Sequence, residues 1–207
     1  MNSINYFNSI AKEWNKIRVD YFKDELREIA VNSVDIKGKV IADLGAGTGF
    51  ISLRVGEEAN LVFPIDSSKN MLKELHKSAK NKNLNNIYPI KGSLEDLPLF
   101  DNSVDIIFMN MALHHVVNPD VAIKEMNRVL KKDGQVIITD VEEHLGEWAT
   151  EEMYDVWLGF RHDQLESWYR EAGFLNIDIK STELIARGES SKGEVIEPKI
   201  FIAKATK

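Results

Sequence analysis

The stretch that decides the fold is Val40-Ile41-Ala42-Asp43-Leu44-Gly45-Ala46-Gly47-Thr48-Gly49-Phe50. Its first five residues are apolar apart from one acid and predict a buried β-strand. The glycines that follow can take positive φ and let a ligand approach the backbone closely. A helix is expected from about Phe50 onward, so the positive end of its dipole would face the same turn. The stretch therefore predicts a strand, a nucleotide-binding turn and a helix.

The chemistry of this turn bears on which nucleotide it holds. A dinucleotide-binding turn has the pattern G-x-G-x-x-G/A, whose last small residue permits close packing of helix against strand. Gly45 and Gly47 match it, but Phe50 stands at the position of the small residue, and Gly49 comes one residue early. A carboxylate at Asp43 would repel a pyrophosphate and attract an ammonium or sulfonium group. The turn therefore favours a positively charged ligand, and a NAD-dependent Rossmann enzyme remains an alternative.

A second strand and a second acid follow the turn. Residues 61–65 predict a strand that ends at Asp66, roughly 20 residues beyond the glycines, where an acid accepts hydrogen bonds from both hydroxyls of a ribose. Ser67 and Ser68 are expected to cap the next helix, in whose first turn Met71 lies either against a bound adenine or in the core. The glycine turn and the acid together indicate a nucleotide-binding site more specifically than either does alone.

Three further strands are predicted over 87–91, 104–109 and 135–140. The alternation of strands and helices predicts an α/β protein with a doubly wound, mainly parallel sheet, whose ligand crevice lies at the carboxyl ends of its strands. The polar residues expected at those ends are Asp43, Asp66, Ser93, Asn110 and Asp140. Their convergence is the strongest argument for a site at this edge of the sheet.

Composition excludes several classes of function. The 207 residues include 33 acids and 26 bases, a net charge of −7, and no Lys/Arg-rich run, so nucleic acid is not an expected partner. The sequence has no cysteine, which excludes disulfides, thiolate metal sites and cysteine nucleophiles within it. Residues 1–5 lack a signal-peptide pattern, and no stretch reaches the roughly 20 apolar residues of a membrane span. We expect a cytoplasmic protein without membrane insertion, and its oligomeric state is not predicted.

An amphipathic helix is predicted near the N-terminus, over 4–21. Trp14 and Arg18 share one face of it, which pairs a flat aromatic ring with a permanent charge, as a lid over a ligand would need. A second helix is expected over 22–33, before the strand of the glycine turn. The N-terminal segment is therefore predicted to be a helical lid.

The C-terminal third begins with an aromatic insert over 141–160. Its aromatic residues could wall a substrate pocket or pack beneath the loop, since loops placed on a rigid sheet commonly carry specificity. A helix is expected over 162–172, followed by a strand pair over 175–179 and 199–203 that the polar loop 187–198 joins. This part of the chain is predicted to form the substrate side.

The motifs together resemble the class I S-adenosylmethionine-dependent methyltransferases of small-molecule type. The resemblance rests on D-x-G-x-G-T-G at 43–49, L-P at 97–98, L-H-H at 113–115 and Y-F-x-x-I-A-x-x-W-x-x-x-R at 6–18. It is closest to the methyltransferase domains fused to arsenical-repressor-type modules and to the quinone-biosynthesis group. It implies a seven-stranded sheet whose last strand is antiparallel. It also implies one methyltransferase domain over 1–207, with a helical lid at 1–36, a cofactor-binding half at 37–141 and a substrate side at 142–207.

The resemblance implies S-adenosylmethionine as the cofactor and S-adenosylhomocysteine as its product. The residues that it implies for cofactor binding are Asp43, Gly45, Ala46, Gly47, Asp66, Ser67, Met71, Ser93, Leu94, Glu95 and Asn110. The N-P-P-Y motif of nucleobase methylases is absent at 110–116, which argues against base methylation. Arsenite methylation requires cysteine thiols, which the sequence lacks. A small-molecule acceptor of unidentified chemistry is expected.

The resemblance also implies a direct displacement of the methyl group, for which the protein supplies alignment in a dry site. The candidates for a general base are, in order, His144, His115, His114 and Asp140. The candidates for substrate contact are Tyr6, Trp14, Arg18, Trp148 and Trp157. No metal is assigned. A metal-assisted site of three histidines, at 114, 115 and 144, and a non-catalytic regulatory protein that binds the same cofactor are alternatives.

Overall fold

The computed structural model describes residues 3–207. Its strands are β1 (Val40–Leu44), β2 (Leu61–Asp66), β3 (Ile90–Lys91), β4 (Val104–Asn110), β5 (Leu130–Val141), β6 (Leu175–Ile185), β7 (Gly188–Glu189), β8 (Val195–Ile196) and β9 (Lys199–Thr206). Its helices are α1 (Ser3–Ile10), α2 (Trp14–Tyr21), α3 (Glu25–Val31), α4 (Ser52–Val55), α5 (Lys69–Asn81), the 3₁₀ helix η1 (Leu113–His115), α6 (Pro119–Val129), α7 (Trp148–Glu152) and α8 (His162–Glu171). None of these helices is long and apolar enough to cross a membrane.

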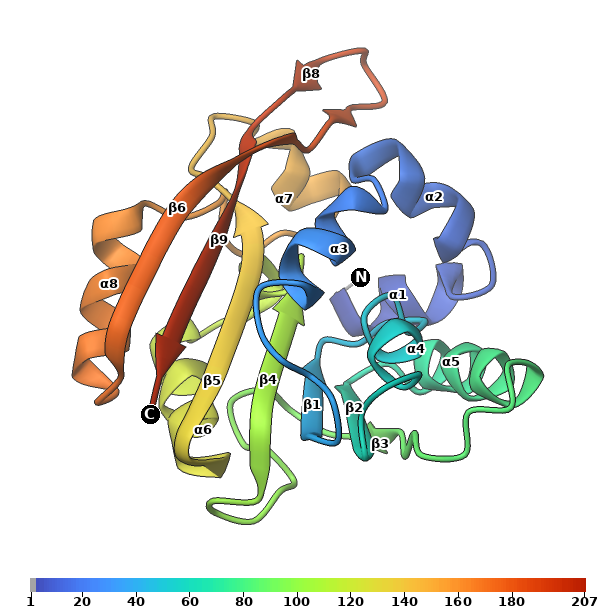
Figure 1. The fold of residues 1–207 in the computed structure, drawn as a ribbon. Coiled ribbons are helices and arrows are strands. Elements are labelled where there is room, and N and C mark those ends of the chain that lie inside the picture. Colours follow the sequence, from blue (N-terminus) through green and yellow to red (C-terminus); the bar gives the residue numbers. More distant parts are fainter. Residues whose placement is uncertain (1–2) are drawn as a thin grey trace.

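Seven of the strands form one sheet in the order β3-β2-β1-β4-β5-β9-β6 (Figure 1). β1 to β5 run parallel, and β9 runs antiparallel to both of its neighbours. The predicted α/β class, mainly parallel doubly wound sheet and antiparallel last strand are confirmed. Met1 and Asn2, which belong to the predicted 1–207 domain, lie outside the described residues.

Side chains of the central strands alternate between two layers of helices, because successive residues of a strand point to opposite faces. Ile41 and Ile137 pack with residues of α3, α4 and α5 on one face. Leu44 and Ile138 pack with residues of α6 and α8 on the other. Both faces of these strands are therefore buried, which explains why their sequences read as nearly continuous apolar runs.

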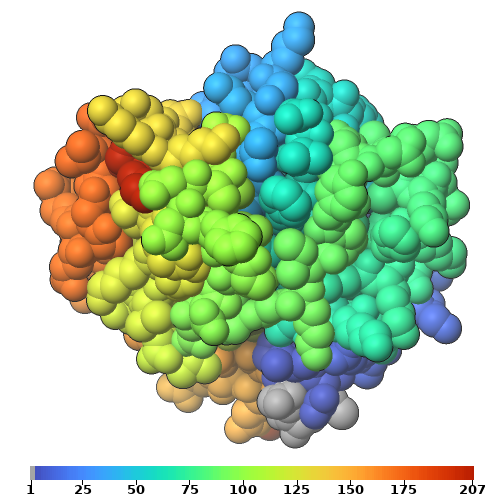
Figure 2. Space-filling model, turned by 90° about the horizontal axis from the view of Figure 1, so that it is seen from below, coloured from blue at the N-terminus to red at the C-terminus, as the bar shows by residue number. Residues whose placement is uncertain are grey.

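The carboxyl ends of the parallel strands are covered by the N-terminal helices and the insert. In Figure 1 the arrowheads of β4 and β5 point toward α7, and α1 and α2 lie to one side of them. Asn8 of α1 accepts hydrogen bonds through Oδ1 from Ser68 Oγ (3.0 Å) and Asn70 N (3.1 Å), at the start of α5. Figure 2 shows the blue N-terminal atoms beside orange atoms of the segment around residue 150. The N-terminal segment is thus anchored across the edge of the sheet.

The N-terminal helix predicted over 4–21 is two helices, α1 and α2, separated by a turn at 11–13. The two halves have separate anchors. Asn8 binds the start of α5, whereas Asn15 Oδ1 accepts a hydrogen bond from Thr48 Oγ1 (2.7 Å) in the glycine turn. The helix predicted over 22–33 is shorter than expected and spans only α3.

Two differences concern strands. β3 pairs with β2 only at Ile90 and Lys91, with one further bridge from Ile87 to Val62, because Pro89 has no N–H to donate. β6 extends to Ile185, and the loop predicted over 187–198 contains the hairpin of β7 and β8. This hairpin lies beyond the carboxyl ends of the strands, above α7 in Figure 1.

Candidate functional site

The glycine turn joins β1 to α4 through a backbone that glycine adopts most easily. Gly45, Gly47 and Gly49 have φ angles of +67°, +52° and +96°. A Cβ built on Gly45 would lie 2.4 Å from the Cβ of Ala112, far inside contact distance. The amides of Gly45 and Ala46 donate to the Ile65 carbonyl (2.8 and 3.2 Å). The turn is therefore held over the end of β2, with no room for a side chain at its first glycine.

Asp66 ends β2 and turns its carboxylate toward the glycine turn. Its Oδ2 accepts a hydrogen bond from Gly47 N (2.8 Å) and its Oδ1 from Ser68 N (2.7 Å). Burial raises the pKa of this carboxyl group, and the two amide hydrogen bonds lower it. The Ser68 hydroxyl caps α5 by accepting a hydrogen bond from Met71 N (3.2 Å). The neighbouring Ser67 lines a cleft.

Asp43 lies deeper than the sequence predicted. It is 2% exposed, and its Oδ2 accepts hydrogen bonds from the backbone N (2.9 Å) and the hydroxyl of Ser52, at the start of α4. Burial raises the pKa of Asp43 to about 7, although the two Ser52 hydrogen bonds lower it. Asp43 does not line the cleft, so in this structure it fixes the helix after the turn. Its effect on a bound cofactor stays a prediction.

The cleft lies at the carboxyl ends of β1, β2 and β4 and has a volume of about 870 Å³, within the range of small-molecule sites. All of the predicted cofactor residues except Asp43 line it, namely Gly45, Ala46, Gly47, Asp66, Ser67, Met71, Ser93, Leu94, Glu95 and Asn110. Its other side is mostly apolar and aromatic, with Ile4, Phe7, Trp14, Phe22, Met111, Val116, Tyr154 and Val156. Phe7 and Met111 were not among the predicted site residues, although Phe7 belongs to the motif at 6–18.

Two polar residues of the cleft are already hydrogen-bonded within the protein. Glu95 Oε1 accepts from the N (2.7 Å) and Nδ2 (2.8 Å) of Asn118, and Asn110 Oδ1 accepts from Thr139 Oγ1 (2.8 Å). Each bond joins one strand end or loop to the next. They hold the adenine end of the predicted cofactor site in place and leave part of each side chain's hydrogen-bonding capacity for a ligand.

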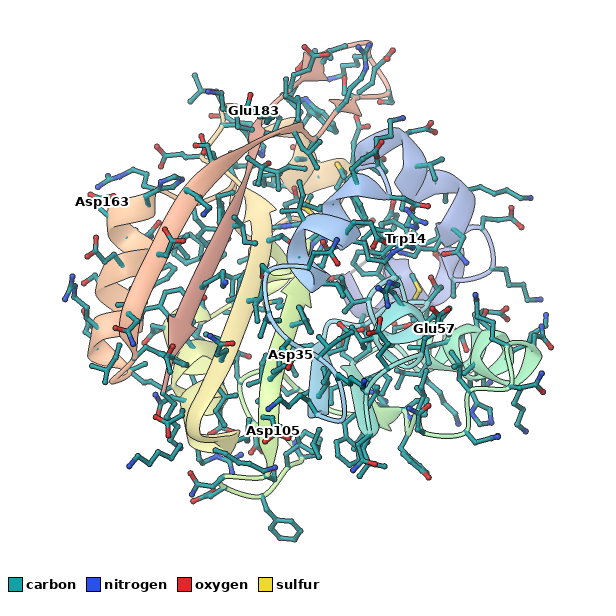
Figure 3. All side chains as sticks on the ribbon, viewed as in Figure 1. Trp14, Asp35, Glu57, Asp105, Asp163 and Glu183 are labelled. Atoms are coloured by element: carbon teal, nitrogen blue, oxygen red, sulfur yellow. The ribbon has the colours of Figure 1, made fainter. Side chains whose placement is uncertain are left out.

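A second, smaller cavity adjoins the cleft between the N-terminal helices and the insert. Its volume is about 60 Å³, roughly the space of two water molecules. The two spaces share a wall made of Phe7, Trp14, Phe22, Met111 and His115. The remaining lining includes Tyr6, Tyr21, His114, His144 and Asp155. Of the predicted substrate residues, Tyr6 and Trp14 therefore face a cavity, and Figure 3 labels Trp14 on the N-terminal helices.

His114 is held by Asp140 on the wall of this inner cavity. His114 Nδ1 lies 2.6 Å from Asp140 Oδ1, and Asp140 Oδ2 accepts a hydrogen bond from Leu113 N (2.9 Å). Burial alone would lower the pKa of His114, but the charges of Asp140 and Asp155 and the hydrogen bond to Asp140 raise it to about 9. Asp140 is 0% exposed and lines neither cavity. Asp140 thus holds His114, and its predicted role as a base stays a prediction.

The other two histidines have different partners. His115 Nδ1 lies 3.3 Å from the Tyr154 carbonyl oxygen, and His144 Nδ1 lies 3.2 Å from Gly146 N, whose hydrogen it accepts. Burial lowers the pKa of both rings, and the neighbouring charge of His114 lowers it further. Both rings face the inner cavity, and His115 also faces the cleft. Their catalytic roles stay predictions.

Asp155 is a candidate that sequence analysis missed. Its side chain is 7% exposed, and its Oδ1 lies 3.6 Å from His115 Nδ1 and 3.8 Å from His114 Nε2. Within residues 3–207 this oxygen has no hydrogen-bond partner. Burial raises the pKa of Asp155 to about 6, although the charge of His114 lowers it. No sequence spacing could have found this contact, because it depends on the path of the insert between β5 and α8.

Arg18 lines neither cavity, so the structure does not bring it to the site, and its contact with the substrate stays a prediction. Its guanidinium carbon lies 4.3 Å from the centre of the Phe50 ring, and its Nη2 bonds to Asp24 Oδ1 (3.0 Å). Arg18 and Trp14 share a helix face as expected, but the charge packs against the bulky residue that follows the glycine turn.

Two predicted substrate residues of the insert lie outside both cavities and pack against other parts of the protein. Trp148 packs under the β7–β8 hairpin, where a Cβ at Gly188 would lie 3.0 Å from its Cη2 atom. Trp157 donates through Nε1 to the Val116 carbonyl (3.0 Å) and packs edge-on against Trp168. Neither lines the cleft or the inner cavity. The aromatic character of the insert therefore serves mainly to fasten it to the core.

Comparison with known proteins finds methyltransferases. Residues 42–138 match the family described as "Methyltransferase domain". The uncharacterized methyltransferase YcgJ of Bacillus subtilis is 33% identical over 100 residues, which are 48% of this chain and 40% of YcgJ. Its crystal structure matches with a TM-score of 0.79 at 17% identity, over 89% of this chain and 99% of that chain. This structural likeness shows the fold alone.

Two curated relatives carry named activities. The malonyl-[acyl-carrier protein] O-methyltransferase of Buchnera aphidicola is 34% identical over 141 residues, 68% of this chain and 51% of the relative. The demethylmenaquinone methyltransferase of Listeria welshimeri is 31% identical over 131 residues, 62% of this chain and 54% of the relative. The matched region spans about half the length of these curated relatives.

Proposed function

The chain belongs to the class I S-adenosylmethionine-dependent methyltransferase family, and on this premise we propose that it transfers a methyl group from S-adenosylmethionine to a small-molecule acceptor. The observation that carries the proposal is the cleft, which joins the glycine turn, the acid Asp66 and an apolar, aromatic wall at one edge of the sheet. The composition of that wall favours an acceptor with a largely apolar body.

The residues of the cleft fit this cofactor. The positive φ angle of Gly45 and its packing against the Ala112 Cβ require glycine there, and the glycine turn lines the cleft where the cofactor would lie. Asp66 accepts two amide hydrogen bonds and retains lone pairs for ribose hydroxyls. Met71 and Leu94 offer apolar contact to an adenine ring. When bound, the cofactor supplies a methyl group on a positively charged sulfur, already activated for displacement.

The protein's own contribution is alignment and the exclusion of water. The aromatic side chains of Phe7 and Trp14 come from the N-terminal helices and line the side of the cleft that faces the inner cavity. Tyr6 packs against Tyr154 of the insert, with ring centres 5.1 Å apart, so the lid and the insert close on each other. An acceptor held between this wall and the cofactor would be positioned for direct displacement in a dry site.

Calorimetric titration with S-adenosylhomocysteine and with NAD tests the cofactor. We expect roughly micromolar affinity for S-adenosylhomocysteine and no detectable binding of NAD, because Phe50 and Gly49 depart from the dinucleotide pattern. Affinity for NAD alone would refute the proposal. Fractionated cell metabolites incubated with methyl-labelled cofactor would then identify the acceptor. Cofactor binding without label transfer to any fraction would instead support a non-catalytic regulatory protein.

Substitution of Asp66 tests the ribose contact. We expect Asp66→Asn to weaken S-adenosylhomocysteine binding about 10- to 100-fold, because the amide loses the charge that strengthens hydrogen bonds to the hydroxyls. Asp105→Asn is the matched control. Asp105 Oδ2 also accepts from a strand amide, Val40 N (2.8 Å), but at the opposite end of the sheet (Figure 3). Equal losses of affinity in the two variants would mean that Asp66 acts through stability alone.

A further inference from the structure

We propose that His114, His115 and Asp155 bind a divalent transition-metal cation in the inner cavity, with Zn²⁺ as the first candidate. The three residues each offer one ligand atom, and these atoms lie within 4.8 Å of one another. The structure thus brings together two of the three histidines considered as a metal site from sequence and replaces the third, His144, by an acid.

The distances suit a metal that is bound with small adjustments. In a tetrahedral zinc site with bonds of about 2.0–2.2 Å, neighbouring ligand atoms lie about 3.3–3.5 Å apart. Asp155 Oδ1 lies 3.6 Å from His115 Nδ1 and 3.8 Å from His114 Nε2. These two separations are too long for hydrogen bonds and only a few tenths of an ångström longer than coordination requires, whereas the widest spacing in the cluster, up to 4.8 Å, requires a larger movement of a ring. His115 would exchange its 3.3 Å contact with the Tyr154 carbonyl for the metal.

The unpartnered oxygen of Asp155 is the observation that points to a ligand. A buried carboxylate oxygen without a hydrogen bond is costly, and such groups are normally paired. Asp155 Oδ1 has no hydrogen-bond partner within residues 3–207, although its side chain is only 7% exposed. No Lys or Arg in that part of the chain forms an ion pair with it. A cation between Asp155 and the two imidazoles would supply the missing partner.

Asp140 provides the outer partner that metal-binding histidines usually have. A ligating histidine commonly donates its other ring N–H to a carboxylate, which fixes the tautomer and the ring orientation. His114 Nδ1 lies 2.6 Å from Asp140 Oδ1, which leaves Nε2 as the atom directed to Asp155. Asp140 is in turn fixed by the amide of Leu113 (2.9 Å). His114 is therefore already oriented as a ligand.

The cavity has the size and donor set for a cation. Its volume of about 60 Å³ is enough for a metal ion with one or two waters. Two imidazoles and one carboxylate, without thiolates, suit zinc and other borderline divalent metals of open, catalytic type. A metal here would lie behind His115, which is part of the wall shared with the cleft.

Titration of the untagged, chelator-treated protein with Zn²⁺ tests the site without any cofactor, so its result is independent of the proposed methyl transfer. We expect one equivalent to bind and to raise the thermal midpoint, and Co²⁺ to give visible d–d absorption typical of imidazole and carboxylate ligands. Asp155→Asn and His114→Ala should each lower the metal affinity about 100-fold or more. His144→Ala is the matched control, because His144 lines the same cavity outside the cluster and should leave the affinity unchanged.

The melting temperature of Asp155→Asn shows whether a loss of metal binding is merely a loss of folding. Without metal, this variant should melt close to the wild-type temperature, because it keeps the size of the side chain and one of its oxygens and removes a buried charge. Failure of the wild-type protein to bind Zn²⁺, Co²⁺, Mn²⁺ or Fe²⁺ at submillimolar concentrations would overturn the proposal. So would equal binding by wild type and a folded Asp155→Asn, or an equal loss in His144→Ala.

Discussion

Replacement of Gly45 by alanine is expected to abolish detectable S-adenosylhomocysteine binding and to lower the free energy of unfolding by about 2–4 kcal/mol. Two costs add. An L residue at φ of +67° pays left-handed backbone strain of about 1 kcal/mol. The added Cβ would also lie 2.4 Å from the Ala112 Cβ, so the turn or the segment after β4 must move. Both segments line the cleft, and displacement of either changes the cofactor site.

Two matched variants separate strain from collision. Gly38 has nearly the same φ angle, +69°, but a Cβ there meets nothing within 4 Å, so Gly38→Ala should cost only the strain and leave binding intact. Ala112→Gly removes the atom that the new Cβ would strike, and the double variant Gly45→Ala/Ala112→Gly should recover part of the affinity. Chemical denaturation and calorimetry measure both quantities. If Gly45→Ala binds the ligand like wild type, the turn does not approach the cofactor as proposed.

The turn and the first two strands could be predicted from sequence because their signals are local. Positive φ selects glycine residue by residue, and a buried parallel strand reads as an apolar run whatever packs on it. Asp66, Ser93 and Asn110 were placed correctly for a related reason. The carboxyl ends of parallel strands must meet at one edge, so strand order alone brings these side chains to one cleft.

The substrate side could not be predicted because its contacts depend on tertiary packing. The insert is rich in aromatic residues, but such a pattern does not distinguish the wall of a pocket from a contact with the core. Trp157 packs against the core. Asp155 carried no pattern, since its neighbours His114 and His115 come from a different element. The packing partners of Phe50 likewise could not be predicted from the sequence. In the structure its ring packs between Arg18 and Arg27, whose guanidinium carbons lie 4.3 and 5.2 Å from its centre.

Phe50 also shows how the turn departs from a dinucleotide site. In that pattern a small residue lets the helix pack closely against the strand. Here the chain passes through Gly49, at φ of +96°, and α4 begins only at Ser52. The start of this helix is fixed by Asp43, which accepts the backbone amide of Ser52 (2.9 Å). The acid before the glycines therefore shapes the turn from within, whatever it contributes to a ligand's charge.

Because Asp43 is buried, the free energy of unfolding is expected to fall as pH rises from about 4 to about 7. The variant Asp43→Asn should lack this pH-dependent contribution. Burial raises the pKa of the folded protein's Asp43 from 3.8 to about 7. The folded state therefore binds a proton that the unfolded state releases, so this group favours folding below the unfolded pKa and loses that contribution as pH rises through the folded pKa. Each pKa unit of difference is worth about 1.4 kcal/mol. Relative to wild type, the free energy of unfolding of Asp43→Asn should therefore rise by about 2–3 kcal/mol between pH 5 and pH 8.

Denaturant unfolding of both proteins at several pH values measures this difference, and subtraction cancels the titration of other carboxyl groups. Asparagine keeps an oxygen that can accept from Ser52 N, so the variant tests the charge more than the shape of the site. Ligand binding gives a second readout. The sulfur of S-adenosylhomocysteine is neutral, so the positive charge of this ligand that Asp43 can sense is its ammonium group. With that group near Asp43, the ionised carboxylate is favoured, so the wild-type affinity should fall more steeply than that of Asp43→Asn as pH drops below about 7. If the affinity of both proteins has the same pH profile while their stabilities differ, Asp43 organises the turn without sensing the ligand.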